Sequence, residues 1–94
     1  MSQIWKYEIR AITDVVELSM PVGAEVLTVQ VQRGMPCIWA RVNPAAPRVL
    51  RMFRIVGTGY DLPVPPWPCR LEYMGTFQMH DGNFVWHVFQ EIPQ

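Results

Sequence analysis

Residues 75–90, GTFQMHDGNFVWHVFQ, alternate between two sets of side chains on either side of Asp81-Gly82. An Asp-Gly step with alternating residues on both flanks predicts a β-hairpin. Folding the ribbon about that step gives one apolar face, which we expect in the core: Phe77, Met79, Phe84, Trp86 and Val88. The other face is too polar for a core and too apolar for bulk solvent, which suggests a binding surface: Met74, Thr76, Gln78, His80, Val85, His87 and Phe89.

The same period of two recurs along most of the chain, and no long window has the 3.6-residue period of a helix. Further strands are expected at residues 4–10, 15–20, 25–32, 35–43 and 48–58. Short strands separated by turn signals predict an all-β fold, a small antiparallel sandwich or partly open barrel of six to seven strands. A chain of 94 residues is too short for two independent cores, so we expect residues 1–94 to form one domain.

A second hairpin is predicted at the Arg33-Gly34 step. A two-residue turn there places Val31 opposite Pro36 and Leu27 opposite Ala40. In this register Pro36 needs no hydrogen bond to its hairpin partner, so its missing N–H points to the other side of the strand. We therefore expect a sheet edge or a gap beside Pro36 on that side.

The composition indicates a soluble protein with apolar surface left for a partner. Half of the residues are hydrophobic, and the chain has four Trp, four Phe and three Tyr. The formal net charge of zero does not favour DNA, RNA or an acidic membrane as a partner. No segment reaches the roughly 20 apolar residues that span a bilayer, and the N-terminus lacks a signal-peptide pattern, so we expect a cytoplasmic location.

The sequence predicts neither a metal site nor a catalytic site. Cys37 and Cys69 match no common zinc-ligand spacing with the two histidines, and we expect both thiols to be reduced, with no cofactor bound. Thr76 and His87 lie opposite each other in the predicted hairpin, but catalysis needs a third, orienting group in a cleft. Residues 57–59, Gly-Thr-Gly, do not lead into a helix, so a strand-ending turn is preferred to a phosphate loop. We expect a non-enzymatic protein.

The arginines are unevenly distributed along the chain. No acidic residue lies between Glu25 and Asp61, whereas five of the eight basic residues fall in that window. Solvated strand faces that balance nearby acids are one explanation. The other is a binding site, because guanidinium forks hold phosphates, stack on aromatic rings and form hot spots in protein interfaces. The predicted ligand-binding residues are Trp39, Arg41, Arg51, Arg54, Trp67, Gln78 and His87.

Four segments carry a resemblance to a known family. They are IWKYEI at 4–9, VQVQ-G-PCIWA at 29–40, FRI-GTG at 53–59 and YMGTFQM with FVWHVF at 73–89. On these segments the chain resembles a family of small phage-encoded proteins of unknown function. The resemblance implies a setting in the bacterial cytoplasm, and it implies no activity and no site residues.

Small phage proteins without a catalytic site often counter host defence, which is an analogy of setting. The expected function is therefore sequestration of a small anionic nucleotide signal of host defence by a homo-oligomer. The alternative is a protein-binding inhibitor of a host defence enzyme or complex, of the anti-restriction or anti-CRISPR type. We expect self-association through the hairpin face that carries Val85, His87 and Phe89.

Overall fold

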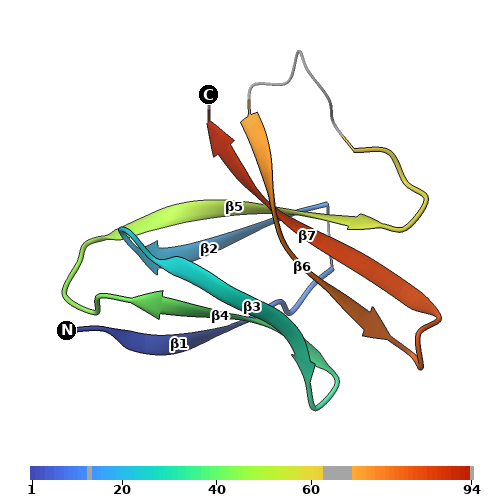
Figure 1. The fold of residues 1–94 in the computed structure, drawn as a ribbon, viewed down its shortest axis with the longest axis horizontal. Coiled ribbons are helices and arrows are strands. Elements are labelled where there is room, and N and C mark those ends of the chain that lie inside the picture. Colours follow the sequence, from blue (N-terminus) through green and yellow to red (C-terminus); the bar gives the residue numbers. More distant parts are fainter. Residues whose placement is uncertain (13, 63–68, 94) are drawn as a thin grey trace.

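A computed structural model describes residues 1–12, 14–62 and 69–93, which form seven β-strands. One antiparallel sheet has the order β1 (Gln3–Glu8), β4 (Met35–Val42) and β3 (Glu25–Gln32). The other has the order β2 (Val15–Pro21), β5 (Arg48–Gly57), β7 (Phe84–Pro93) and β6 (Cys69–Met79). The sheets do not close into a barrel (Figure 1), so the all-β prediction is confirmed in its open, two-sheet form. Among the described residues there is no helix long and apolar enough to cross a membrane.

Both predicted hairpins are present, and positive φ angles explain their turn sequences. Arg33 and Gly34 have φ angles of 51° and 79°, the signs that a two-residue type I′ turn requires. The β6–β7 loop has four residues and is closed by the Asn83 N–H, which donates to the His80 carbonyl at 3.0 Å. Gly82 in this loop has a φ of 85°, a conformation that glycine adopts without steric cost. Figure 1 shows both turns on the same side of the molecule.

The register of the β3–β4 hairpin follows the prediction near the turn and departs from it further away. Val31 lies opposite Pro36 as expected, but Val26 lies opposite Ala40, where Leu27 was predicted. A register shift between Val26 and Thr28 marks a bulge, which adds one residue to β3. The prediction for Leu27 was wrong because an uninterrupted ladder was assumed.

Pro36 lies where the strand beside it ends. β1 pairs with β4 as far as Glu8 opposite Cys37, one residue short of Pro36. The Ile9 N–H donates to the Pro36 carbonyl at 2.8 Å, and Pro36 has no N–H to donate in return. The expected gap beside Pro36 is therefore confirmed. Because antiparallel hydrogen-bonded pairs alternate, this bond also fixes which β1 residues turn their backbone groups toward β4, namely the odd-numbered ones.

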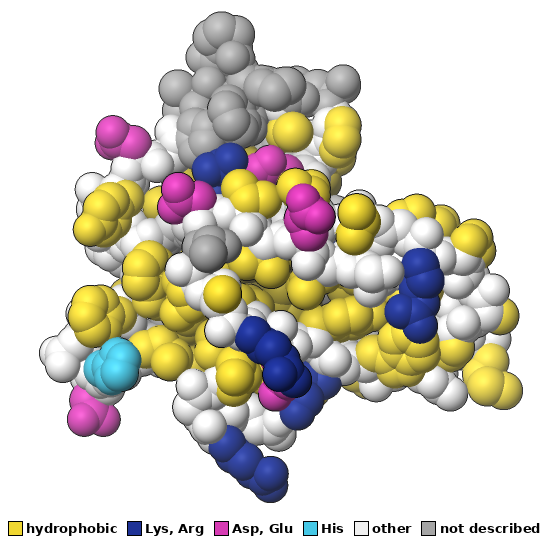
Figure 2. All heavy atoms as spheres, turned by 180° about the vertical axis from the view of Figure 1, so that it is seen from behind, with side chains coloured by type: hydrophobic (Ala, Val, Ile, Leu, Met, Phe, Trp, Pro, Cys, Tyr) yellow, Lys and Arg dark blue, Asp and Glu magenta, His cyan; other side chains and the backbone are white. Residues whose placement is uncertain are grey.

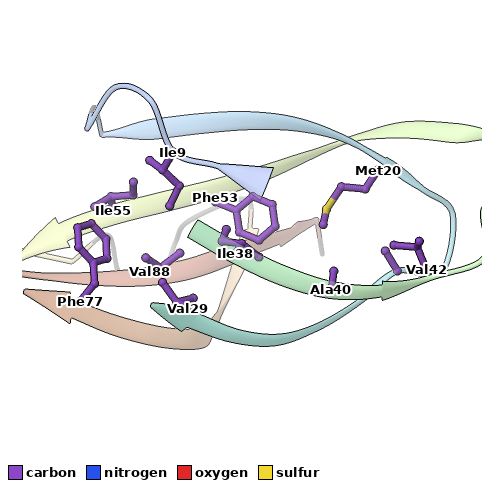
Figure 3. Packing of buried hydrophobic residues seen from close by; sticks show 11 residues of the cluster. Ile9, Met20, Val29, Ile38, Ala40, Val42, Phe53, Ile55, Phe77 and Val88 are labelled. Atoms are coloured by element: carbon purple, nitrogen blue, oxygen red, sulfur yellow. The ribbon is translucent and has the colours of Figure 1, made fainter. Parts of the chain in front are cut away.

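The core lies between the two sheets. Ile38 of β4 and Phe53 of β5 are both fully buried, and Figure 3 shows their side chains with that of Val88 in the space between the sheets. The cluster of buried hydrophobic residues is Ile9, Met20, Ala24, Val29, Ile38, Ala40, Val42, Phe53, Ile55, Phe77 and Val88. Met79 and Trp86 are partly buried against it.

Phe84 is the exception on the predicted core face of the β6–β7 hairpin. Its side chain is 52% exposed, so its assignment to the core was wrong. Phe84 is the first residue after the loop, and its ring lies edge-on to the His80 ring at 5.5 Å between centroids. The strand alternation placed Phe84 on the correct side of the hairpin, but the hairpin tip extends past the buried cluster.

The sandwich is closed along one side and open along the other. β3 and β6 meet where Gly75 lies against Val29, and a Cβ on Gly75 would be only 2.9 Å from the Val29 Cβ. At the other ends of the sheets, β1 and β2 are edge strands that do not pair with each other. On the face seen in Figure 2, hydrophobic side chains form a band between groups of charged side chains.

Candidate functional site

Trp39 and Arg41 lie on the outer face of the β1–β4–β3 sheet. They alternate along β4 with the buried Ile38 and Ala40, so they point away from the core. Arg41 forms an ion pair with Glu25 at 2.8 Å, and both side chains are more than half exposed. This is the solvated, charge-balanced strand face that the sequence offered as one explanation of the arginines.

Arg54, Gln78 and His87 lie on the outer face of the other sheet, on the opposite side of the core. Arg54 alternates along β5 with the buried Phe53 and Ile55. Its guanidinium contacts the Glu91 carboxylate, with both Nε and Nη2 at 3.2 Å from Oε2. The two side chains are only 18% and 9% exposed, so this ion pair is largely shielded from water.

Arg51 points between the two sheets. Its Nη1 donates to the Ala24 carbonyl at 2.7 Å and its Nη2 to Gln90 Oε1 at 2.6 Å. Burial lowers the pKa of the Arg51 guanidinium from its ordinary value, while Glu72 and Tyr7 act in the opposite direction. Arg51 therefore ties β5 to the β2–β3 turn and to β7.

The predicted ligand-binding residues consequently do not converge. Trp39 and Arg41 are on one outer face, Arg54, Gln78 and His87 are on the other, and Arg51 lies between the sheets. Trp67 lies outside the described residues. The sequence places residues on alternate faces of each strand, but it does not give the order of the strands, which decides which faces coincide.

His87 is the centre of a chain of side-chain hydrogen bonds on the outer face of the second sheet. Its Nε2 is 2.7 Å from the Thr58 hydroxyl, and its Nδ1 is 3.0 Å from the Thr76 hydroxyl. The Thr76 hydroxyl also contacts the Tyr73 hydroxyl at 2.5 Å. The Tyr73 ring packs edge-on against Phe89, at 5.6 Å between centroids. The Thr76–His87 pair expected from the hairpin is present, and both ring nitrogens face hydroxyl groups.

The turn after β5 brings Thr58 to this position. The Thr58 N–H donates to the Val85 carbonyl at 3.1 Å, and the Tyr60 N–H closes the turn on the Gly57 carbonyl at 3.1 Å. The Tyr60 ring packs on Gly57, where an added Cβ would be 3.0 Å from Cδ2 of the ring. The Gly57 position therefore allows an aromatic ring to lie against the strand end while 76% of Tyr60 stays exposed.

Three adjacent hollows surround this turn, and all of them are lined by Gly57 and Tyr60. The largest, of about 540 Å³, is bordered by Arg54, Trp86 and the two carboxylates of Asp14 and Asp61. The second, of about 350 Å³, lies toward Phe84 and Asn83. The third, of about 190 Å³, lies over His87 and Phe89. We call the region formed by Thr58, Tyr60, Tyr73, Thr76, His87 and Phe89 the turn-and-hairpin surface.

Three residues of this surface were missed from the sequence: Thr58, Tyr60 and Tyr73. The available signal was the Gly57–Tyr60 segment, which was interpreted only as a strand-ending turn. That interpretation is confirmed, but a turn beside the start of β7 also places its side chains next to His87. Tyr73 reaches Thr76 across a bulge between Tyr73 and Gly75, which alternation cannot foresee.

The fold and this surface define a small two-sheet β-protein with a partly exposed patch of hydroxyl, imidazole and aromatic side chains. In residues 1–12, 14–62 and 69–93, no three His, Cys, Asp or Glu side chains gather where a metal ion could be held. Both cysteines are free thiols. A family model described as a domain of unknown function, DUF7352, matches residues 1–94, and the chain belongs to this family. Comparisons with curated proteins and with solved structures gave no match.

Proposed function

We propose that the protein is a non-enzymatic binding protein that contacts a protein partner through the turn-and-hairpin surface. The observation that carries the proposal is the group of three hollows around the exposed Tyr60 ring. Tyrosine is enriched among residues that dominate protein interfaces, because it combines a large apolar ring with a polar end. Tyr73, which is 58% exposed, adds a second exposed aromatic ring to this surface.

The charges near this surface support a protein partner over an anionic nucleotide. Asp14 and Asp61 border the largest hollow, and their carboxylates would repel a phosphate. Arg54 is the basic residue of that hollow, and its charge is already balanced by Glu91. A small-molecule site also encloses most of its ligand, whereas these hollows are open to solvent.

The setting is part of the proposal. A phage-encoded protein in the bacterial cytoplasm, as the resemblance implies, would use such a surface to inhibit a host defence enzyme or complex. This role needs no catalytic groups in the protein itself, because binding alone can block the partner.

A second candidate, sequestration of an anionic nucleotide signal, has support at a different place. Arg48 forms no ion pair with a described residue, and its guanidinium lies 5.0 Å from the centre of the Trp5 ring. Burial raises the pKa of the Tyr7 hydroxyl, and the positive charges of Arg48 and Arg51 oppose this rise. A nucleotide could meet positive charge and an aromatic face there.

The two candidates are separated by one set of measurements. The protein would be used as bait in lysate of a bacterial host, the captured partner purified, and its affinity measured for Tyr60→Ala and for Arg41→Ala. We expect Tyr60→Ala to weaken binding at least tenfold, as loss of a hot-spot aromatic does. Arg41→Ala, on the opposite face, should leave the affinity unchanged.

Thermal-shift measurements with cyclic dinucleotides, cyclic trinucleotides and cyclic ADP-ribose isomers complete the comparison. A ligand that binds only the folded state raises the melting temperature by mass action. A shift that is lost in Arg48→Ala, together with the absence of any purifiable partner, would replace the first candidate by the second. Equal binding by Tyr60→Ala and the unaltered protein would refute the proposed surface.

A further inference from the structure

The edge of β1 presents a row of unpaired backbone groups. The Ile9–Pro36 hydrogen bond shows that odd-numbered β1 residues face β4, so Ile4, Lys6 and Glu8 direct their N–H and C=O groups outward. No described residue pairs with this edge, and Figure 1 shows β1 at the margin of its sheet. Such a row is a template for another strand.

The other three sheet edges are less suited to this role. β3 and β6 are packed against each other at Val29 and Gly75. On β2, the bonds from the Ile55 N–H to the Asp14 carbonyl and from the Val22 N–H to the Pro47 carbonyl turn even-numbered residues toward β5. Pro21 is therefore at an outward position, where it offers no N–H to a partner.

The side chains of β1 are complementary to a second copy of themselves. Antiparallel pairing about a two-fold axis, with even-numbered residues hydrogen-bonded, allows three registers in which Lys6 faces an outward residue of the second β1. In the first register the residue opposite Lys6 is Lys6 of the second copy, in the second register it is Ile4, and in the third it is Glu8. The first register opposes like charges and the second leaves Lys6 beside an apolar side chain. The third places Lys6 opposite Glu8 twice, once on each side of the axis.

We propose that two copies of the chain associate by antiparallel pairing of β1 with β1, with Lys6 of each copy opposite Glu8 of the other. The pairing joins two three-stranded sheets into one sheet of six strands. Tyr7 meets Tyr7 of the second copy on the axis, as a non-hydrogen-bonded pair. The turn-and-hairpin surface lies on the other sheet and stays free for a partner.

The present contacts of these side chains are compatible with the pairing. Lys6 Nζ donates to Gln32 Oε1 at 3.0 Å on the exposed outer face, and it has further donors for a carboxylate. Glu8 accepts from Arg10 Nη2 at 2.8 Å, and the carboxylate can accept from both cations. The face of Val85, His87 and Phe89, at which self-association was expected, lies on β7 of the other sheet and is not used by this pairing.

The decisive experiment is charge reversal followed by restoration. Lys6→Glu and Glu8→Lys each place two pairs of like charges across the axis, and each should raise the dimer dissociation constant at least tenfold in sedimentation equilibrium. The double variant Lys6→Glu/Glu8→Lys recreates two opposite-charge pairs and should return the constant to within about threefold of the unaltered protein. Arg33→Glu, which makes the same reversal in the β3–β4 turn, should leave it unchanged.

A cysteine cross-link tests the register. In a Cys69→Ser background, Tyr7→Cys should form an intermolecular disulfide under mild oxidation, because Cα atoms of a non-hydrogen-bonded pair are about 4.5 Å apart. Trp5→Cys should not, because the two Trp5 positions are offset by four residues, about 13 Å along the strands. Circular dichroism would verify that each variant is folded. A monomer at 100 μM, no rescue by the double variant, or cross-linking at position 5 in place of position 7 would each overturn the proposal.

Discussion

The two long hairpins of the molecule are built alike and differ in what their outer faces carry. β3–β4 and β6–β7 each have a turn with positive φ angles, and each has one bulge. The outer face of β3–β4 carries exposed charge, with Arg41 paired to Glu25. The outer face of β6–β7 carries a chain of hydrogen bonds between hydroxyl groups and the His87 ring.

This difference indicates which of the two outer faces is suited to contact with water and which is suited to contact with a partner. Exposed ion pairs such as Arg41–Glu25 keep a strand face hydrated and add little to stability. The β6–β7 face has hydroxyl, imidazole and aromatic groups that can be desolvated at a lower cost than charges. A partner is therefore expected on the second face, and the three hollows lie beside it.

The largest expected effect comes from the place where the two hairpins touch. Gly75→Val should lower the free energy of unfolding by about 3 kcal/mol, because its side chain would overlap the buried Val29. Urea denaturation measures the change. Gly57→Ala is the control, since the atoms near its added Cβ include the exposed Tyr60 ring, which can move, and it should cost less than about 1 kcal/mol. Equal costs for the two variants would show that β3 and β6 are not tightly joined at Gly75.

An intermediate effect distinguishes the ion pairs on the two outer faces. Arg54→Ala should lower the free energy of unfolding by about 2 kcal/mol, because it leaves the largely buried Glu91 carboxylate without its guanidinium. Arg41→Ala should cost about 0.5 kcal/mol or less, because its pair with Glu25 is exposed. Denaturation in urea at two salt concentrations would test both, and similar values for the two variants would contradict the difference in burial.

The smallest effect is expected at the loop of the β6–β7 hairpin. Gly82→Val should cost about 1–2 kcal/mol, since a β-branched residue is strained at the positive φ of this position. Gly82→Asn should remain within about 0.5 kcal/mol of the unaltered protein, because asparagine tolerates the left-handed region. Thermal unfolding followed by circular dichroism would compare the two, and a loss as large for asparagine as for valine would point to a cause other than backbone strain.

Local pattern was enough to predict the strands, both turns and the face of the β6–β7 hairpin that packs on the core. Phe77 and Val88 are buried where alternation placed them, and the gap beside Pro36 follows from hydrogen-bond parity within one hairpin. The wrong predictions, for Leu27 and Phe84, arose where a strand departs from regular alternation or extends beyond the core. The bulge near Leu27 shifted its partner, and Phe84 is exposed because the hairpin tip extends past the core. A bulge depends on how strands must curve to meet other strands, which no local pattern contains.

The sequence by itself determined that this chain is an all-β protein with tight turns at Arg33-Gly34 and Asp81-Gly82, because period-two alternation and positive-φ residues act within a few positions. Only the tertiary structure decided which faces coincide. The strand order put Trp39 and Arg41 on the opposite side of the core from Arg54 and His87, and it brought Thr58 to His87 from 29 positions away. The physical reason is that side-chain alternation has only two outcomes per strand, whereas convergence at a site depends on which strands become neighbours when the sheets pack.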